Sequence, residues 1–153
     1  MKTLENNLKD VTGAGIGRIL NRNHFFHLLD LEVKRARRYR NFLCLLLVRL
    51  KRGSEGCDGS DFQTCSQLLN DLLTVELRES DILGALGEDR LVALLPYADD
   101  SAGELAKSRF ENILKYFRFD KKGFHVAVEQ ISFPINGADT IDLIKKTLSA
   151  EAT

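Results

Sequence analysis

The chain has 153 residues, and its 22 basic and 22 acidic side chains give a formal net charge of zero at pH 7. This length favours one ordinary soluble domain, which buries roughly two-thirds or more of the surface that the unfolded chain exposes. A neutral chain lacks the excess of Lys and Arg that generic binding to nucleic acid requires.

The cysteines and the apolar runs exclude further classes of protein. Cys44, Cys57 and Cys65 show no CxxC motif and no Cys/His spacing typical of a zinc site. The longest apolar run, from Phe42 to Val48, is far shorter than the about 20 residues of a membrane-spanning helix. We therefore expect a cytoplasmic protein without disulfide bonds, metal, cofactor or membrane contact.

The first 20 residues are polar and contain Gly13, Gly15 and Gly17. This composition predicts a helical lead or linker at 1–20, followed by one domain at 21–153. The glycines do not form a phosphate-binding loop, because no strand precedes them and no Gly-Lys-Ser/Thr follows.

The next two segments have clear hydrophobic patterns. A helix is predicted from about residue 21 to residue 39, with a basic face from Lys34 to Arg40. Its apolar positions are Phe25, Leu28, Leu29, Val33 and Ala36. The continuous apolar run at 42–48 is typical of a strand that is buried on both faces, and we expect it to be the central strand.

The remaining elements follow in a regular order. A second helix is predicted at about 62–78, a β-hairpin at 81–95 with its turn at 87–89, and a third helix through 106–117. A last strand is expected from Phe124 to Phe133, stopped by Pro134, and a closing helix at about 139–148. The order α-β-α-β-β-α-β-α predicts an α/β sandwich.

This order of elements and several short motifs resemble the GGDEF (diguanylate cyclase) family. Residues 21–25 resemble its N-R-x-x-F helix start, residues 33–39 its arginine-rich helix end, and residues 43–48 its first strand. Residues 78–81 resemble its R-x-x-D element, and the hairpin turn lies where the family has its signature. The resemblance implies a nucleotide-cyclase-like sandwich with a ferredoxin-like core, in which helices flank a central, mostly antiparallel sheet.

The departures from the family concern its metal site. In active members, acids at the end of the first strand and in the signature hold two Mg²⁺ ions. Arg49 and Lys51 replace the two strand-end acids. The signature positions are Gly87, Glu88, Asp89, Arg90 and Leu91, so Asp89 is the one carboxylate that matches the family's metal-binding acids. Because added cations repel a metal ion, we expect a degenerate domain without cyclase activity.

Arg78 and Asp81 match the family's inhibitory site, where the resemblance implies binding of cyclic di-GMP. Arg109 is the nearest candidate for the second arginine of that site. A guanidinium group can bind guanine or phosphate, and a carboxylate accepts hydrogen bonds from guanine N–H groups. Alternatively, Asp81 only fixes a turn and Arg78 is a solvated cation at a helix end.

Arg49, Lys51 and Arg90 have two interpretations as well. They either bind phosphate in place of the Mg²⁺ ions, or they close the former cleft by salt bridges to Glu88 and Asp89. Exposed pairs of this kind contribute only about 0–1 kcal/mol each and need no selection to persist.

The other candidate residues favour structural roles. His24 and His27 have no third metal ligand at suitable spacing, and His125 is a strand residue. Cys44 and Cys65 lie on apolar segments and are expected to be inert thiols. The sequence therefore predicts an inactive cyclic di-GMP receptor. The alternative is a protein-interaction or dimerisation module without a nucleotide ligand.

Overall fold

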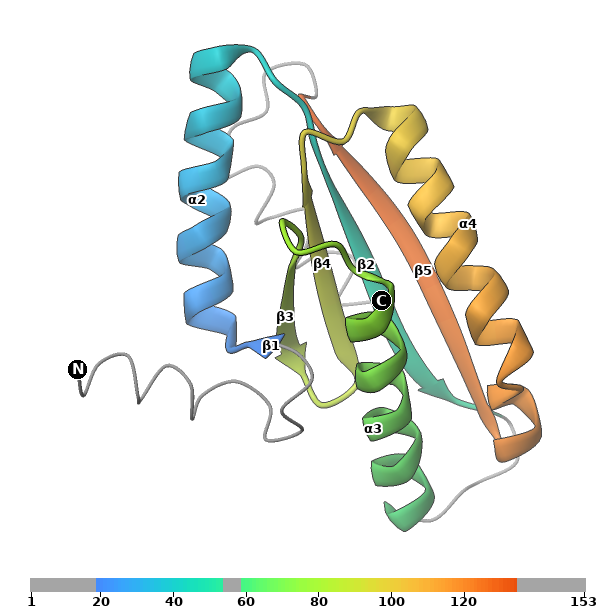
Figure 1. Cartoon of the computed structure of the whole chain (residues 1–153). Helices are drawn as coiled ribbons and strands as arrows, with labels where there is room; N and C mark the ends of the chain where they lie inside the picture. The colour runs from blue at the N-terminus through green and yellow to red at the C-terminus, as the bar shows by residue number, and fades with distance from the viewer. Residues whose placement is uncertain (1–18, 54–58, 135–153) are drawn as a thin grey trace.

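The computed structural model describes residues 19–53 and 59–134 of the chain. They form an open five-stranded sheet with the order β1-β3-β4-β2-β5. Helix α2 covers one face, and helices α3 and α4 cover the other (Figure 1). The elements are β1 Ile19–Leu20, α2 Arg22–Tyr39, β2 Leu43–Arg52, α3 Gly59–Glu76, β3 Ile82–Gly87, β4 Arg90–Pro96, α4 Asp100–Tyr116, a 3-10 turn Phe119–Lys122, and β5 Phe124–Phe133.

The fold predicted from the sequence is confirmed. All neighbouring strands of the sheet pair antiparallel except β1 and β3, which pair parallel. No described helix is long and apolar enough to cross a bilayer. The predicted closing helix and most of the predicted lead lie outside the described residues.

Helix α2 forms where the hydrophobic period predicts it. The side chain of Asn21 accepts a hydrogen bond of 2.9 Å from the backbone N–H of His24, which caps the first turn. The helix ends at Arg40, whose backbone is left-handed with φ 56° and whose N–H donates to the carbonyl of Ala36. This geometry turns the chain into β2.

Strand β2 is buried on both faces, as predicted, but it is not the central strand. It lies between β4 and β5, and β4 occupies the middle of the sheet. A continuous apolar run indicates burial on both faces and carries no information about strand order. Phe42 precedes the strand and is 48% exposed, so the buried run begins at Leu43.

Strands β3 and β4 form the predicted hairpin. The ladder is irregular between Ala85 and Gly87, and Gly87 then pairs with Arg90 across the turn residues Glu88 and Asp89. Both turn residues have negative φ, so Glu at position 88 fits the turn without backbone strain. Irregularities of this kind bend a strand and increase its local twist.

The short strand β1 was not predicted. Ile19 and Leu20 pair with Leu83 and Gly84 of β3, and Ile19 is buried. These two residues lie inside the segment that the sequence assigned to a lead. A two-residue strand has no periodicity of its own, and it is defined only by its pairing with β3.

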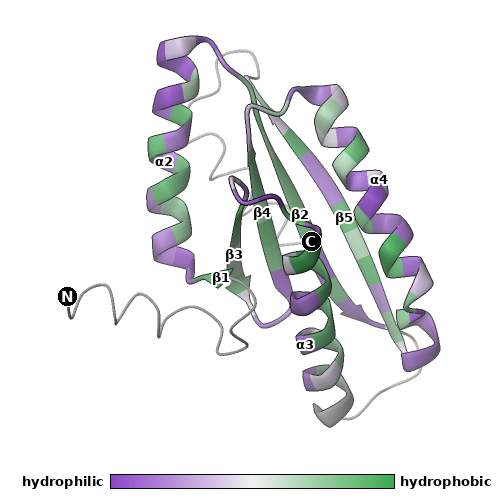
Figure 2. Cartoon of the chain, viewed as in Figure 1, coloured by the Kyte–Doolittle hydropathy of each residue, from purple (hydrophilic) through white to green (hydrophobic). Residues whose placement is uncertain are grey.

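The sheet separates two hydrophobic clusters. Leu29 and Val33 of α2 pack against Leu45 and Leu94 on one face, and α3 and α4 pack against the other. Figure 2 shows β2 and β4 hydrophobic along most of their length, whereas β5 contains both polar and apolar residues. Both clusters hold the hairpin turn and the end of β2 in fixed positions, next to each other.

Candidate functional site

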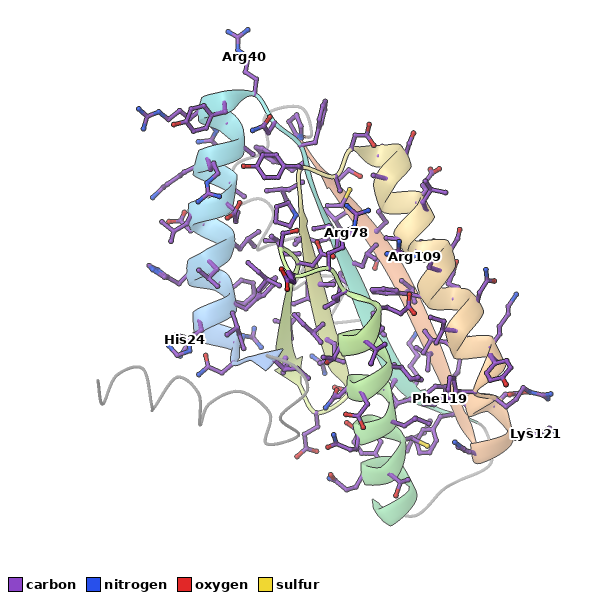
Figure 3. The ribbon with its side chains drawn as sticks, in the orientation of Figure 1. His24, Arg40, Arg78, Arg109, Phe119 and Lys121 are labelled. Atoms are coloured by element: carbon purple, nitrogen blue, oxygen red, sulfur yellow. The ribbon has the colours of Figure 1, made fainter. Side chains whose placement is uncertain are left out.

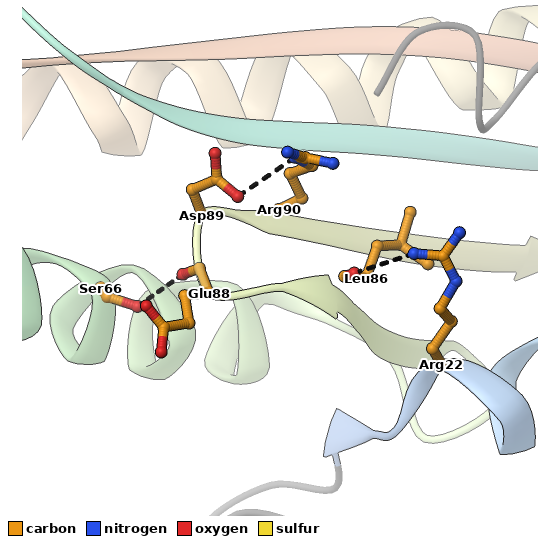
Figure 4. Close-up of polar contacts among 6 residues, drawn as sticks. All are labelled: Arg22, Ser66, Leu86, Glu88, Asp89 and Arg90. Carbon is orange, nitrogen blue, oxygen red and sulfur yellow. Dashed lines mark hydrogen bonds and ion pairs between the residues drawn. The ribbon is translucent and has the colours of Figure 1, made fainter. Parts of the chain in front are cut away.

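The hairpin turn lies beside the end of β2. The backbone N–H of Leu50 donates a hydrogen bond of 2.8 Å to the carbonyl of Asp89, and Arg49 lies directly opposite Arg90 in the ladder. From the other side, the hydroxyl of Ser66 on α3 donates to the carbonyl of Glu88 at 3.1 Å (Figure 4). The structure therefore brings the signature positions and the strand-end cations together, as the resemblance implied.

Asp89 is engaged by its own neighbour in the chain. Its Oδ1 lies 3.1 Å from the Nε of Arg90 (Figure 4). The two side chains are 39% and 33% exposed, which makes this a partly exposed pair. The pair is one of the salt bridges that the sequence suggested, and it places a cation against the one carboxylate that matches the family's metal-binding acids.

A cleft of about 530 Å³ opens between the end of β2 and the turn. It is lined by Arg49, Leu50, Lys51, Arg52, Phe62, Glu88 and Asp89. The guanidinium carbon of Arg52 lies 5.4 Å from the centre of the Phe62 ring, a cation–π contact. Three cations and two acids line this cleft, so the formal charge of its lining is positive.

These residues do not fit a divalent cation. Across residues 19–53 and 59–134, no three His, Cys, Asp or Glu side chains are close enough together to hold a metal ion. Mg²⁺ needs oxygen ligands in a near-octahedral arrangement, and the cations at 49, 51 and 90 repel it.

A second groove, of about 450 Å³, adjoins this cleft and shares Phe62 and Glu88 with it. Amide and hydroxyl side chains of Asn21, Gln63, Ser66 and Asn70 line it, and the Nη1 of Arg22 donates to the carbonyl of Leu86 at 3.3 Å. Sequence reasoning missed this groove, because its residues come from three separate segments and share no motif.

Arg78 and Asp81 are joined by the turn between α3 and β3. The backbone N–H of Arg78 donates a hydrogen bond of 2.9 Å to Oδ2 of Asp81. In return, the N–H of Asp81 donates to the carbonyl of Arg78 at 3.0 Å. The carboxylate of Asp81 therefore fixes the turn, as the structural alternative predicted, and the side chain of Arg78 is exposed.

Arg109 approaches the same turn from α4 (Figure 3). Its Nε lies 3.9 Å from Oε2 of Glu76, at the end of α3, and its side chain is 46% exposed. The pKa of Asp81 is raised, chiefly because the carboxyl group is partly buried. The Arg78 hydrogen bond and the positive charges of Arg78 and Arg109 oppose this shift, so both arginines act on one carboxylate.

The thiols have the structural roles that the sequence predicted. Cys44 and Cys65 are buried and unbridged, and Cys57 lies outside the described residues. The Sγ of Cys44 contacts the carbonyl of Asp99 at 3.3 Å and the hydroxyl of Ser132 at 3.4 Å. Burial raises the pKa of the Cys44 thiol, which lowers its reactivity.

The histidines and the basic face of α2 add no site. His24 is half-buried and His27 exposed, and His125 is exposed on β5. Lys34 pairs with Asp30 at 2.9 Å, and Arg35 pairs with Glu32 at 3.3 Å. Part of the basic face is therefore neutralised within the helix itself.

Comparisons with known proteins bear on the fold. No family model matches the sequence, and no curated protein gives a significant match. Solved structures do match. A DGC protein from Thermotoga maritima superposes with a TM-score of 0.73 at 18% identity, over 90% of this chain and 96% of that one.

Two further structures are similar. The GGDEF domain of FimX from Pseudomonas aeruginosa has a TM-score of 0.64 at 16% identity, and the alignment covers 92% of this chain and 90% of that one. The GGDEF domain of DgcB from Caulobacter crescentus, in complex with c-di-GMP, has a TM-score of 0.67 at 12% identity, over 93% of this chain and 85% of that one. This chain has the fold of GGDEF domains, as the sequence resemblance implied.

Proposed function

We propose that this chain is a catalytically inactive GGDEF-like signalling domain that binds cyclic di-GMP through Arg78, Asp81 and Arg109. The observation that supports the proposal is the convergence of two arginines on one partly buried carboxylate, from the α3–β3 turn and from α4. Two of the structural neighbours are GGDEF domains studied with this nucleotide.

The chemistry of the three residues suits the ligand. Cyclic di-GMP presents two phosphodiesters and two guanines. The exposed guanidinium groups of Arg78 and Arg109 can each form two parallel hydrogen bonds to a phosphate or to guanine O6 and N7. Asp81 uses Oδ2 to hold the turn, and no hydrogen bond from a described residue reaches Oδ1. That oxygen can accept a hydrogen bond from a guanine N–H.

The ion pair of Arg109 with Glu76 competes with the ligand. At 3.9 Å, and with both side chains partly exposed, the pair is weak and contributes about 0–1 kcal/mol. Arg109 can therefore leave Glu76 for a ligand phosphate at little cost. Removing the charge of Glu76 should make Arg109 more available.

Isothermal titration calorimetry with cyclic di-GMP tests the proposal. We expect micromolar affinity for the full chain, no measurable binding by Arg78→Ala, and weaker binding by Arg109→Ala. Glu76→Gln should bind a few-fold more tightly than the natural chain. Arg38→Ala removes an exposed arginine on α2 and serves as the matched control. Absence of heat at high nucleotide concentration refutes the proposal.

Catalytic inactivity has a separate test. The proposal rests on Arg49, Lys51 and Arg90 at the positions where acids would hold Mg²⁺. The chain incubated with GTP and Mg²⁺ or Mn²⁺ should produce no cyclic dinucleotide that chromatography can detect. A measurable product would show that the lost acids are not essential in this domain.

A further inference from the structure

Strand β5 forms one edge of the sheet, and the described part of the chain pairs nothing with its outer side (Figure 1). It pairs with β2 over ten consecutive positions, from Leu43 opposite Phe133 to Arg52 opposite Phe124, without a register shift. A long, regular edge strand is a template on which another strand can add.

The hydrogen-bond pattern fixes which backbone groups face outward. The N–H of Gly53 donates to the carbonyl of Gly123 at 2.7 Å, so this opposed pair is hydrogen-bonded. In an antiparallel ladder such pairs alternate, so the odd-numbered residues of β5 bond to β2. The even-numbered residues direct their N–H and C=O groups to the outer edge. They are Phe124, Val126, Val128, Gln130 and Ser132.

The sequence and regularity of this strand lack several devices that block an edge against pairing. Phe124–Phe133 contains no Pro, no Lys and no bulge, which are the common devices that block an edge. His125 and Glu129 are its titratable residues, and both are exposed on the face that α2 shares. While β5 pairs with β2 on one side, its other side can therefore pair with another strand.

The structure also leaves room beside this edge. An open groove of about 660 Å³ runs between α4 and the beginning of β5. Phe124, His125 and Val126 line it on the strand, and polar side chains including Ser108, Asn112 and Lys115 line it on the helix. The outer side of the first residues of β5 is therefore open to another strand.

We propose that the occupant of this edge is β5 of a second copy, in antiparallel, two-fold symmetric pairing centred on Ala127. The outward pattern requires even-numbered residues to pair with even-numbered ones, which limits the possible registers. Centring on Ala127 places His125 of each copy opposite Glu129 of the other. Centring on Glu129 would instead place two carboxylates face to face, which is unfavourable.

The register centred on Ala127 has a second advantage. Ala127 meets its own copy at a non-hydrogen-bonded position, where Cα atoms approach to about 4.5 Å and a small side chain fits best. Val126 then pairs with Val128 of the second copy, and these residues carry outward N–H and C=O groups. On each side of the axis, the imidazole of His125 faces the carboxylate of Glu129, which can accept its N–H, and a β-branched pair forms; both contacts favour this register.

The pairing leaves the proposed nucleotide site free. Arg78 lies in the turn after α3, and Arg109 of α4 contacts Glu76 at the end of α3. Neither arginine lines the groove beside β5. The dimer inference is therefore independent of cyclic di-GMP binding. Failure of one does not imply failure of the other.

Sedimentation of the full chain tests the pairing. We expect a dimer whose fraction rises across the micromolar range. Val128→Pro removes an outward N–H without removing a bond to β2, a position at which an edge strand tolerates Pro. This variant should be monomeric with an unchanged circular dichroism spectrum, and Val128→Thr, which keeps the N–H, should remain dimeric. A natural chain that is monomeric at every concentration, or a dimeric Val128→Pro, overturns the proposal.

Disulfide trapping tests the register. In a Cys57→Ser background, Ala127→Cys should form a cross-linked dimer on oxidation, because its Cα separation lies within the range for a disulfide. Glu129→Cys should not, because that residue lies four positions from its own copy. If Glu129→Cys formed the cross-linked dimer and Ala127→Cys did not, the register would be wrong. The double variant His125→Glu with Glu129→Lys should dimerise more tightly than Glu129→Lys alone, and equal affinities would contradict the charge argument.

Discussion

Arg49 on β2 lies directly opposite Arg90 on β4, so two guanidinium groups share one position of the ladder. Like charges placed directly opposite each other are unfavourable in an antiparallel pair, which means that neighbouring acids must offset them. Asp89 does so for Arg90 at 3.1 Å. This arrangement explains why the cleft beside the turn does not fit a divalent metal.

The first prediction concerns metal binding in this cleft. Added Mg²⁺ should leave the thermal unfolding midpoint of the natural chain unchanged, since cations surround Asp89. The double variant Arg49→Asp with Arg90→Glu creates three neighbouring carboxylates with Asp89 and should gain a midpoint that rises with Mg²⁺ concentration. A natural chain that Mg²⁺ stabilises, measured by differential scanning fluorimetry, would contradict the charge argument.

The second prediction concerns Gly84, which lies against the ring of Phe25. A Cβ atom at this position would lie 2.6 Å from two ring carbons, so the core would have to shift. Gly84→Ala should therefore lower the free energy of unfolding by about 1–3 kcal/mol, measured by urea denaturation. Gly87→Ala is the matched control. Its Cβ meets only Asp89 Oδ1 at 3.4 Å, and we expect a change within about 0.5 kcal/mol.

The third prediction concerns the pH dependence caused by Asp81. Its pKa is raised by burial, so the folded chain binds this proton more tightly than the unfolded chain does. The associated stability is present below the unfolded pKa and is lost as the pH rises through the folded pKa.

The two neutral substitutions at this position separate its roles. Asp81→Asn keeps an acceptor for the Arg78 N–H without burying a charge, and should be at least as stable as the natural chain at neutral pH. That advantage should shrink as the solution is acidified. Asp81→Ala loses the hydrogen bond and should be less stable by about 0.5–1.5 kcal/mol. An Asp81→Asn variant less stable than Asp81→Ala would refute this account.

The fourth prediction concerns the reactivity of Cys44. The thiol is buried beside the carbonyl of Asp99, and burial raises its pKa. Iodoacetamide at about pH 8, below the usual thiol pKa, should leave Cys44 unmodified in the folded chain. Peptide mapping by mass spectrometry should find it modified only after unfolding in urea. Rapid modification of the folded chain would show that the thiol is accessible.

Several elements could be predicted from the sequence for clear physical reasons. The 3.6-residue hydrophobic period predicted α2, and the two apolar runs separated by Gly-Glu-Asp predicted the hairpin of β3 and β4. Phe124 to Phe133 was predicted as a strand with the bounds that the structure has. These are local patterns, and the nearest residues along the chain are sufficient to produce them.

Other features could not be predicted, because they depend on partners distant in the sequence. The strand β1 exists only through its pairing with β3, and the middle position of β4 depends on which strands flank it. The amide-lined groove joins Asn21 to Asn70 and Gly87, which have no relation in sequence. The pairing of strands and the lining of a groove are set only when the sheet has assembled.

The sequence by itself determined the order of helices and strands, and it placed cations at 49, 51 and 90. Only the tertiary structure decided what those residues face. In the folded chain Arg49 lies opposite Arg90, Asp89 forms an ion pair with Arg90, and Arg109 lies beside Glu76. Local propensity follows from neighbouring residues, whereas the charge around a site is set by segments that folding brings together.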